Sequence, residues 1–207
     1  LFGSIDQPEN FLELMNLITT DHRNTKRNVW MWRGQANINW PIDSGAFRKL
    51  SNFEGVVTEK DIISYEKTLL KQARHKGYDG SQNGGTLSDM ELLSRLQHHG
   101  AATRLVDFSK NSLIALWFCV GTMNYKEETG LLFGIHSSSI GGGVEGELEE
   151  TDYHHQIRKL HNYNYPMFIE VPVVSKRIAS QHGVFLYSDV CKDPKGSLKL
   201  AEEPQHN

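Results

Sequence analysis

Apolar residues recur at helical spacing in four stretches of the chain. This spacing predicts helices over residues 8–19, 59–76, 88 to 98 or 99, and 111–122. The third helix starts with an S-x-x-E capping box at Ser88, and Gly100 follows its end. The fourth, NSLIALWFCVGT, has almost no polar side, which is typical of a helix packed on all sides. We therefore expect residues 111–121 to form the most buried helix.

Short apolar runs between and after these helices predict strands. They lie at residues 29–34, 130–136, 167–172 and 183–187. Residues 35–55 are expected to be irregular, residues 101–110 to form a loop, and residues 192–207 to fray.

Because helices dominate the first half and strands the second, the order predicts an α+β fold. We expect a single compact domain with N-terminal helices and a small mixed sheet. The domain is placed at residues 1–190, and a polar C-terminal tail at residues 191–207.

Composition narrows the class of protein. Apolar residues make up 38% of the chain and charged residues 23%, which excludes a largely disordered chain. The net charge of −3 argues against non-specific binding to duplex DNA. Cys119 and Cys191 have no CxxC spacing, so a reducing compartment and a cytoplasmic location are expected. The apolar runs are too short to span a bilayer, and no membrane partner is expected.

The first candidate site segment is Trp32-Arg33-Gly34-Gln35. Arg33 stands at a strand end, and the following glycine allows another backbone or a ligand to come close. A guanidinium carries five donors in a planar fork, which suits a phosphate or a carboxylate. The alternative is a structural pair between Arg33 and a core aspartate.

The second segment, residues 97–109, reads QHHGAATRLVDFS and is dense in donors and acceptors. His98, at a helix end, could act as an acid or base near neutral pH, or be a structural residue. Asp107 could pair with Arg104 or Arg33, and Thr103 or Ser109 could cap the helix that follows.

The third segment, residues 177–185, places Gln181 just before an apolar strand. Gln181 could orient a ligand or satisfy backbone groups at the strand entry. Metal binding is not expected, since the ten histidines include no HExxH motif and no pair four residues apart. We expect the three segments to converge, so that one concave site is lined or underlain by Arg33, His98, Arg104, Asp107 and Gln181.

Together these segments resemble the FRG domain family. The matching motifs are Trp32-Arg33-Gly34, the stretch LQHHGAATRLVDF at residues 96–108, and RIASQHGVF at residues 177–185. The resemblance covers residues 5–188. The chain departs from the family pattern at His99, where an aromatic Tyr or Phe is usual, and at residues 42–44. FRG domains are associated with bacterial toxins and phage defence.

A second resemblance, to ADP-ribosyltransferases, rests on the aromatic-Arg-Gly strand. It implies an NAD-using transferase whose target is a protein or a nucleic acid. The implied nucleotide-binding residues are Arg33, Gly34, Gln35, Thr103 and Arg104. The implied catalytic residues are His98, Asp107 and Gln181, although no glutamate stands at the last of these positions. The alternative is a non-catalytic sensor or interaction domain that binds a phosphorylated ligand or a phage protein.

Overall fold

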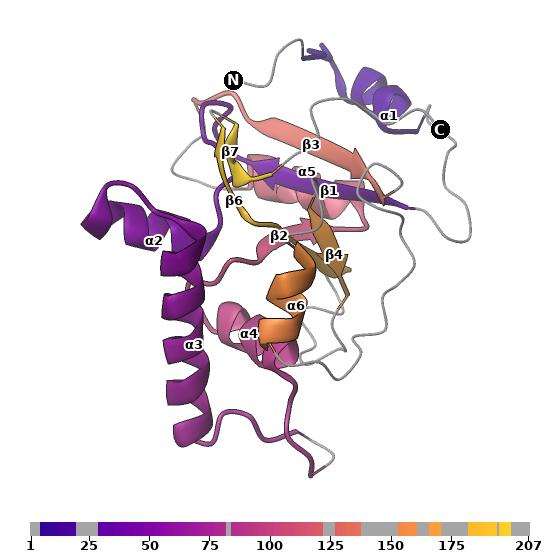
Figure 1. Cartoon of the computed structure of the whole chain (residues 1–207). Coiled ribbons are helices and arrows are strands. Elements are labelled where there is room, and N and C mark those ends of the chain that lie inside the picture. The colour runs from indigo at the N-terminus through magenta and orange to yellow at the C-terminus, as the bar shows by residue number, and fades with distance from the viewer. Residues whose placement is uncertain are drawn as a thin grey trace.

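The computed structural model describes residues 5–19, 29–81, 84–121, 127–137, 153–160, 166–170, 182–193 and 195–199. The described helices are α1 (Phe11–Thr19), α2 (Gly45–Glu54), α3 (Glu59–His75), α4 (Asp89–His98), α5 (Ser112–Val120) and α6 (Tyr153–Leu160). The described strands are β1 (Trp30–Gln35), β2 (Val106–Ser109), β3 (Leu131–His136), β4 (Met167–Ile169), β5 (Gly183–Tyr187), β6 (Val190–Asp193) and β7 (Gly196–Leu198). The expected α+β class is confirmed (Figure 1).

Five strands form one sheet in the order β3-β1-β2-β5-β4. All of its described pairs are antiparallel, so the expectation of a mixed sheet was wrong. Strand β2 was expected to be a loop because Asp107 and Ser109 make it look polar. In the structure Val106 and Phe108 are buried, and β2 pairs with β5 over four residues. Alternation of buried and polar residues over so short a stretch is easily missed in a sequence.

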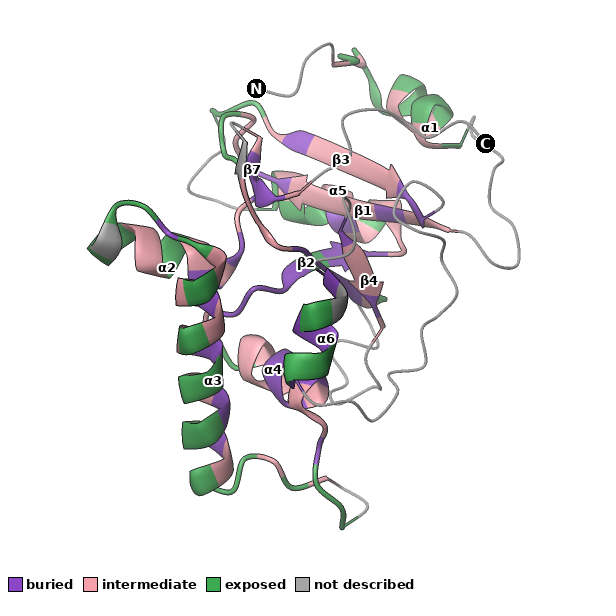
Figure 2. Ribbon diagram, viewed as in Figure 1, coloured by how far each residue is buried: buried purple, intermediate pink, exposed green. Residues whose placement is uncertain are grey.

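The largest core cluster joins α3, α4 and α6 to strands β4 and β5. Figure 2 shows the consequence on α3, which is buried along the side facing α4 and α6 and exposed on its outer side. The apolar spacing that predicted α3 therefore marks its packed side. The Ser88–Glu91 capping box expected at the start of α4 is present, with Ser88 N donating to Glu91 Oε2 at 2.8 Å.

Helix α2 lies in a region that was expected to be irregular. Ser44 caps it by accepting a hydrogen bond from the Phe47 amide at 3.2 Å. Its apolar residues Ala46, Phe47 and Leu50 lie at helical spacing, and Ala46 reaches zero exposure in a cluster with Val57 and Ile62. The interpretation of this region as irregular overlooked that spacing. Packing on Val57 and Ile62 and the bond from the Ala46 amide to the Thr103 carbonyl at 2.9 Å stabilise the helix.

The hairpin β6–β7 lies in the expected polar tail. Leu198 is buried in a core cluster with Met31 and Ile42. The Ser197 amide donates to Asp43 Oδ1 at 2.7 Å, and Ser197 Oγ accepts from the Ser44 amide at 3.2 Å. The folded part therefore continues past residue 190, and residues 192–193 and 195–199 do not match the expected frayed end.

Helix α5 packs closely on β1. A Cβ built on Gly34 would lie 1.8 Å from the carbonyl oxygen of Ala115, so the glycine lets the helix lie directly on the strand. Ala115 is the buried residue of α5, whereas Trp117 is 61% exposed and Val120 70% exposed. The expectation that this helix is the most buried was wrong. The helix uses one narrow side to contact the sheet and leaves its larger apolar residues in solvent.

We expect Trp117→Ala to change the free energy of unfolding by no more than about 0.5 kcal/mol, because substitutions at exposed positions have effects of this size. Ala115→Leu serves as the contrast, since Ala115 is 1% exposed and lies against Gly34. It should destabilise the protein by about 1–3 kcal/mol through overpacking. Urea denaturation measures both changes, and a large loss in Trp117→Ala would contradict the exposed position of this ring.

No helix in the described part of the chain is long and apolar enough to cross a membrane. Cys119 and Cys191 are both free thiols.

Candidate functional site

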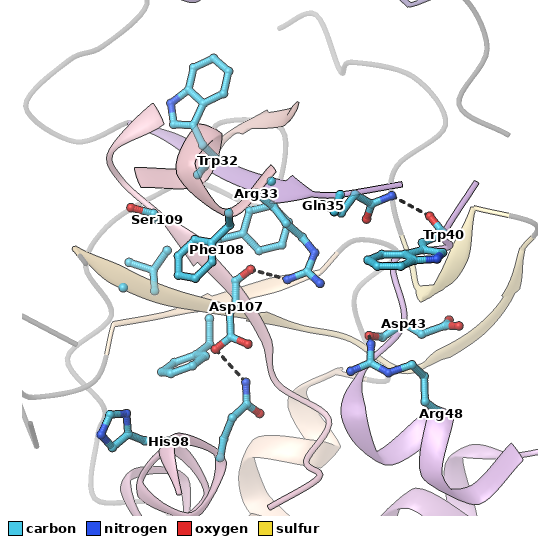
Figure 3. Close-up of a pocket in the computed structure, with 18 of the residues that line it drawn as sticks. Trp32, Arg33, Gln35, Trp40, Asp43, Arg48, His98, Asp107, Phe108 and Ser109 are labelled. Atoms are coloured by element: carbon cyan, nitrogen blue, oxygen red, sulfur yellow. Dashed lines mark hydrogen bonds between the residues drawn. The ribbon is translucent and has the colours of Figure 1, made fainter. Parts of the chain in front are cut away.

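A cavity of about 800 Å³ opens where β1, β2 and β5 meet α2, the end of α4 and α5 (Figure 3). Its size lies within the range of small-molecule sites. The strands supply Arg33, Asp107 and Phe185, and the turn after β1 supplies Trp40. Of the three sequence segments, each therefore contributes residues to one concave site.

Arg33 extends from β1 into this cavity (Figure 3). Its Nη1 donates to the backbone carbonyl of Asp107 at 2.8 Å. Its Nε is buried and has no hydrogen-bond partner. Burial lowers the pKa of Arg33, the nearby Asp107 carboxylate opposes this change, and Arg48 adds to it. The guanidinium is thus held in place by a neutral oxygen while much of its donor capacity is unused.

Asp107 is exposed at the cavity wall. Its Oδ1 accepts a hydrogen bond from Gln97 Nε2 at 3.0 Å. The expected pairing of this carboxylate with Arg104 is wrong, and Arg33 bonds the backbone of Asp107 rather than its side chain. The second carboxylate oxygen is left available on the cavity side of β2.

Gln97 connects Asp107 to Thr103. The buried Thr103 hydroxyl donates to Gln97 Oε1 and accepts from the Leu105 amide at 3.2 Å. This contact fixes the amide of Gln97 so that its NH₂ group points toward Asp107. Thr103 lies outside the cavity lining, so the structure gives it a positioning role in place of the expected direct contact with a nucleotide.

Arg104 also lies outside this cavity. Its Nε bonds Glu66 at 2.6 Å, its Nη1 bonds Glu59 at 2.8 Å and its Nη2 bonds the Tyr153 hydroxyl at 2.8 Å. Burial opposes the charge, but Glu66, Tyr153 and Glu59 outweigh it and raise the pKa of Arg104 above its ordinary value. All three guanidinium nitrogens are engaged, so Arg104 is placed as a structural ion pair and not beside the site.

Gly34 and Gln35 shape the cavity by their contacts with backbone atoms of neighbouring segments. Gly34 has the packing role against Ala115 described above. Gln35 is buried, and its Nε2 donates to the carbonyls of Asn37 at 3.3 Å and Trp40 at 2.7 Å. These bonds hold the turn that presents the Trp40 ring, which is 38% exposed, at the cavity wall (Figure 3).

Arg48, on the first turns of α2, is the main cavity residue that the sequence did not indicate. Its Nη1 donates to the carbonyl of Asp43 at 2.7 Å. The Asp43 side chain is occupied separately, by the amide of Ser197. The signal that could have located Arg48 is Ser44, a residue type that begins helices, just upstream in the region taken as irregular.

His98 lies at the cavity lining and contacts His99 edge-to-face, with ring centroids 5.2 Å apart. Ser109 lines the cavity too. Its Oγ accepts from the Asn111 amide at 3.0 Å, and the cap of α5 is Asn111 rather than Thr103 or Ser109. Gln181 lies outside the described residues, although Gly183 and Phe185 of the same motif line the cavity.

The expected convergence is therefore met by Arg33, His98 and Asp107 and not by Arg104. Within the described ranges, no group of three or more histidine, cysteine, aspartate or glutamate side chains could hold a metal ion.

Comparison with known proteins adds one match. Residues 28–128 match the model of the FRG domain. Neither a curated protein nor a solved structure gives a significant match. The matched range contains β1, with Arg33, and β2, with Asp107, as well as the helices α2 to α5. The chain is therefore an FRG-domain protein, with its FRG domain over residues 28–128.

Proposed function

We propose that this FRG-domain protein is an NAD-using transferase that resembles ADP-ribosyltransferases. The observation that carries the proposal is Arg33, whose guanidinium enters the cavity with a buried Nε that has no partner. A cation held by a neutral carbonyl favours an anionic ligand, because a buried charge needs a counter-charge. In the proposed role Arg33 binds the pyrophosphate of NAD.

Asp107 and His98 stand at the same cavity and are assigned to the ribose. In the transfer step the bond from ribose C1′ to the nicotinamide nitrogen breaks, and nicotinamide leaves with the bonding electron pair. A nucleophile on a protein or nucleic-acid target, or water where no target is present, bonds to C1′ and gives up its proton. Asp107 accepts that proton through the oxygen that Gln97 does not hold.

The biological setting belongs to the same proposal. A cytoplasmic effector in bacterial toxicity or phage defence fits an FRG-domain protein whose two cysteines are free thiols. The other candidate is a sensor that binds the nucleotide without chemistry. It is favoured by the fact that Asp107 is already engaged by a neutral donor.

The test is incubation of the whole chain with NAD, followed by mass spectrometry of nicotinamide and ADP-ribose. Wild type should release nicotinamide, and Asp107→Asn should release it about 10²- to 10⁴-fold more slowly, because a proton acceptor has been removed. Glu127→Gln, at an exposed site outside the cavity, is the matched control and should behave as wild type. A rise in melting temperature with NAD but no nicotinamide release would favour the sensor.

A further inference from the structure

Two guanidiniums from different parts of the fold face the same cavity. Arg33 comes from β1 in the sheet and Arg48 from α2, which approaches from the opposite side in Figure 3. They are close enough for Arg48 to contribute to lowering the pKa of Arg33. Like charges that face each other across a cavity repel, so this arrangement is stabilised by an anion between them.

Both guanidiniums are held in the same way. Each uses Nη1 to donate to a neutral backbone carbonyl, that of Asp107 for Arg33 and that of Asp43 for Arg48. The structural arginine Arg104 is bound differently, because its Nε and Nη1 contact the carboxylates of Glu66 and Glu59 at 2.6 and 2.8 Å. No such contact joins Arg33 or Arg48 to a described carboxylate.

The two aspartates of the cavity do not substitute for a ligand. Asp107 Oδ1 accepts from Gln97, and Asp43 Oδ1 accepts from the Ser197 amide. Their positions are therefore fixed by neutral donors, and the two arginines keep most of their N–H groups for another acceptor. Two such forks suit an anion that offers several oxygens on more than one phosphorus atom.

Trp40 adds an aromatic surface beside these charges. Its ring lines the same cavity as Arg33 and Arg48 (Figure 3) and is partly exposed. Gln35 holds the backbone of Trp40 through a 2.7 Å bond, so the ring has a fixed base. An indole face stacks readily on a nucleobase.

We infer that the cavity is a nucleoside-diphosphate site, in which Arg33 and Arg48 share the two phosphates and Trp40 stacks on the base. The inference rests on the proposed function for the role of Arg33 and adds Arg48, Trp40 and the need for two linked phosphates. It does not require any transfer reaction.

Isothermal titration calorimetry of the whole chain with ADP, AMP and inorganic pyrophosphate tests it. Wild type should bind ADP about tenfold or more tightly than AMP, since a charge-assisted bidentate contact is lost with the second phosphate. Arg48→Gln should lower ADP affinity about tenfold and remove the preference for ADP over AMP. Lys49→Gln removes the same charge from the next position of α2, outside the cavity, and should keep wild-type affinity.

Trp40→Ala should weaken the binding of ADP and leave the binding of pyrophosphate unchanged, because pyrophosphate has no base to stack. The inference is overturned if Arg48→Gln and Lys49→Gln bind ADP equally well, or if wild type binds ADP and AMP alike. ADP binding as expected without release of nicotinamide from NAD would leave the inference standing and overturn the transferase. If wild type releases nicotinamide and Arg48→Gln binds ADP as tightly as wild type, the transferase stands and the inference is overturned.

Discussion

Glu66→Ala is expected to lower the free energy of unfolding by about 3–5 kcal/mol, the range for breaking a buried ion pair by removing one partner. Glu66 has zero exposure and accepts three hydrogen bonds at 2.6 Å, from the amide and Nε of Arg104 and from the Tyr153 hydroxyl. Its loss leaves the Arg104 charge buried with Glu59 as its remaining carboxylate.

Urea denaturation measures this effect, with Lys67→Ala as control. Lys67 is the next residue on α3 and is exposed, so its truncation should change stability by less than about 0.5 kcal/mol. Glu66→Gln keeps the shape and one acceptor but not the charge, so its loss of unfolding free energy should lie between those of Glu66→Ala and Lys67→Ala. Equal stability of Glu66→Ala and Lys67→Ala would contradict the role of this network in joining α3, Arg104 and α6.

Arg33→Lys is expected to weaken NAD and ADP binding by about 10- to 100-fold, because lysine keeps the charge and loses the planar fork. The free energy of unfolding should fall by about 0.5–1.5 kcal/mol, the net contribution of the hydrogen bond to the Asp107 carbonyl. Calorimetry gives the first number and thermal melts the second.

Arg95→Lys is the matched control for this change. Arg95 also bonds backbone carbonyls, those of Tyr78 at 3.0 Å and Gly80 at 2.7 Å, and lies outside the cavity lining. It should bind nucleotide as wild type does. If Arg33→Lys melts as early as Glu66→Ala, and wild type gains no stability from NAD, then Arg33 is a structural residue and the nucleotide site is wrong.

Local signals predicted some helices well. The helix expected over residues 59–76 is observed as α3, and the Ser88 capping box starts α4 as expected. Both have an apolar side that packs on other elements. Helix α5 shows the limit of such signals, because its composition reports hydrophobicity and not which side meets a neighbour. Trp117 is exposed because the contact with β1 is made by Ala115.

The site was predictable where its chemistry is concentrated in one stretch of sequence. Arg33, His98 and Asp107 were expected together and line one cavity. Arg104 looked equivalent to Arg33 in the sequence. Its partner Glu66 lies 38 positions away in the chain, on α3, and no local pattern connects the two positions. Arg48 was missed for a related reason, since α2 depends on contacts with Thr103 and the β6–β7 hairpin.

The position of β5 in the sheet determines which residues are needed to express this domain. The FRG match ends at residue 128, yet β5 lies between β2 and β4 and covers the open edge of β2 over four residues. A protein cut to the matched range would present that edge, with its unpaired amides and carbonyls, to other molecules. The range matched by the family model is thus shorter than the sheet, and expression of this domain calls for the C-terminal strands as well.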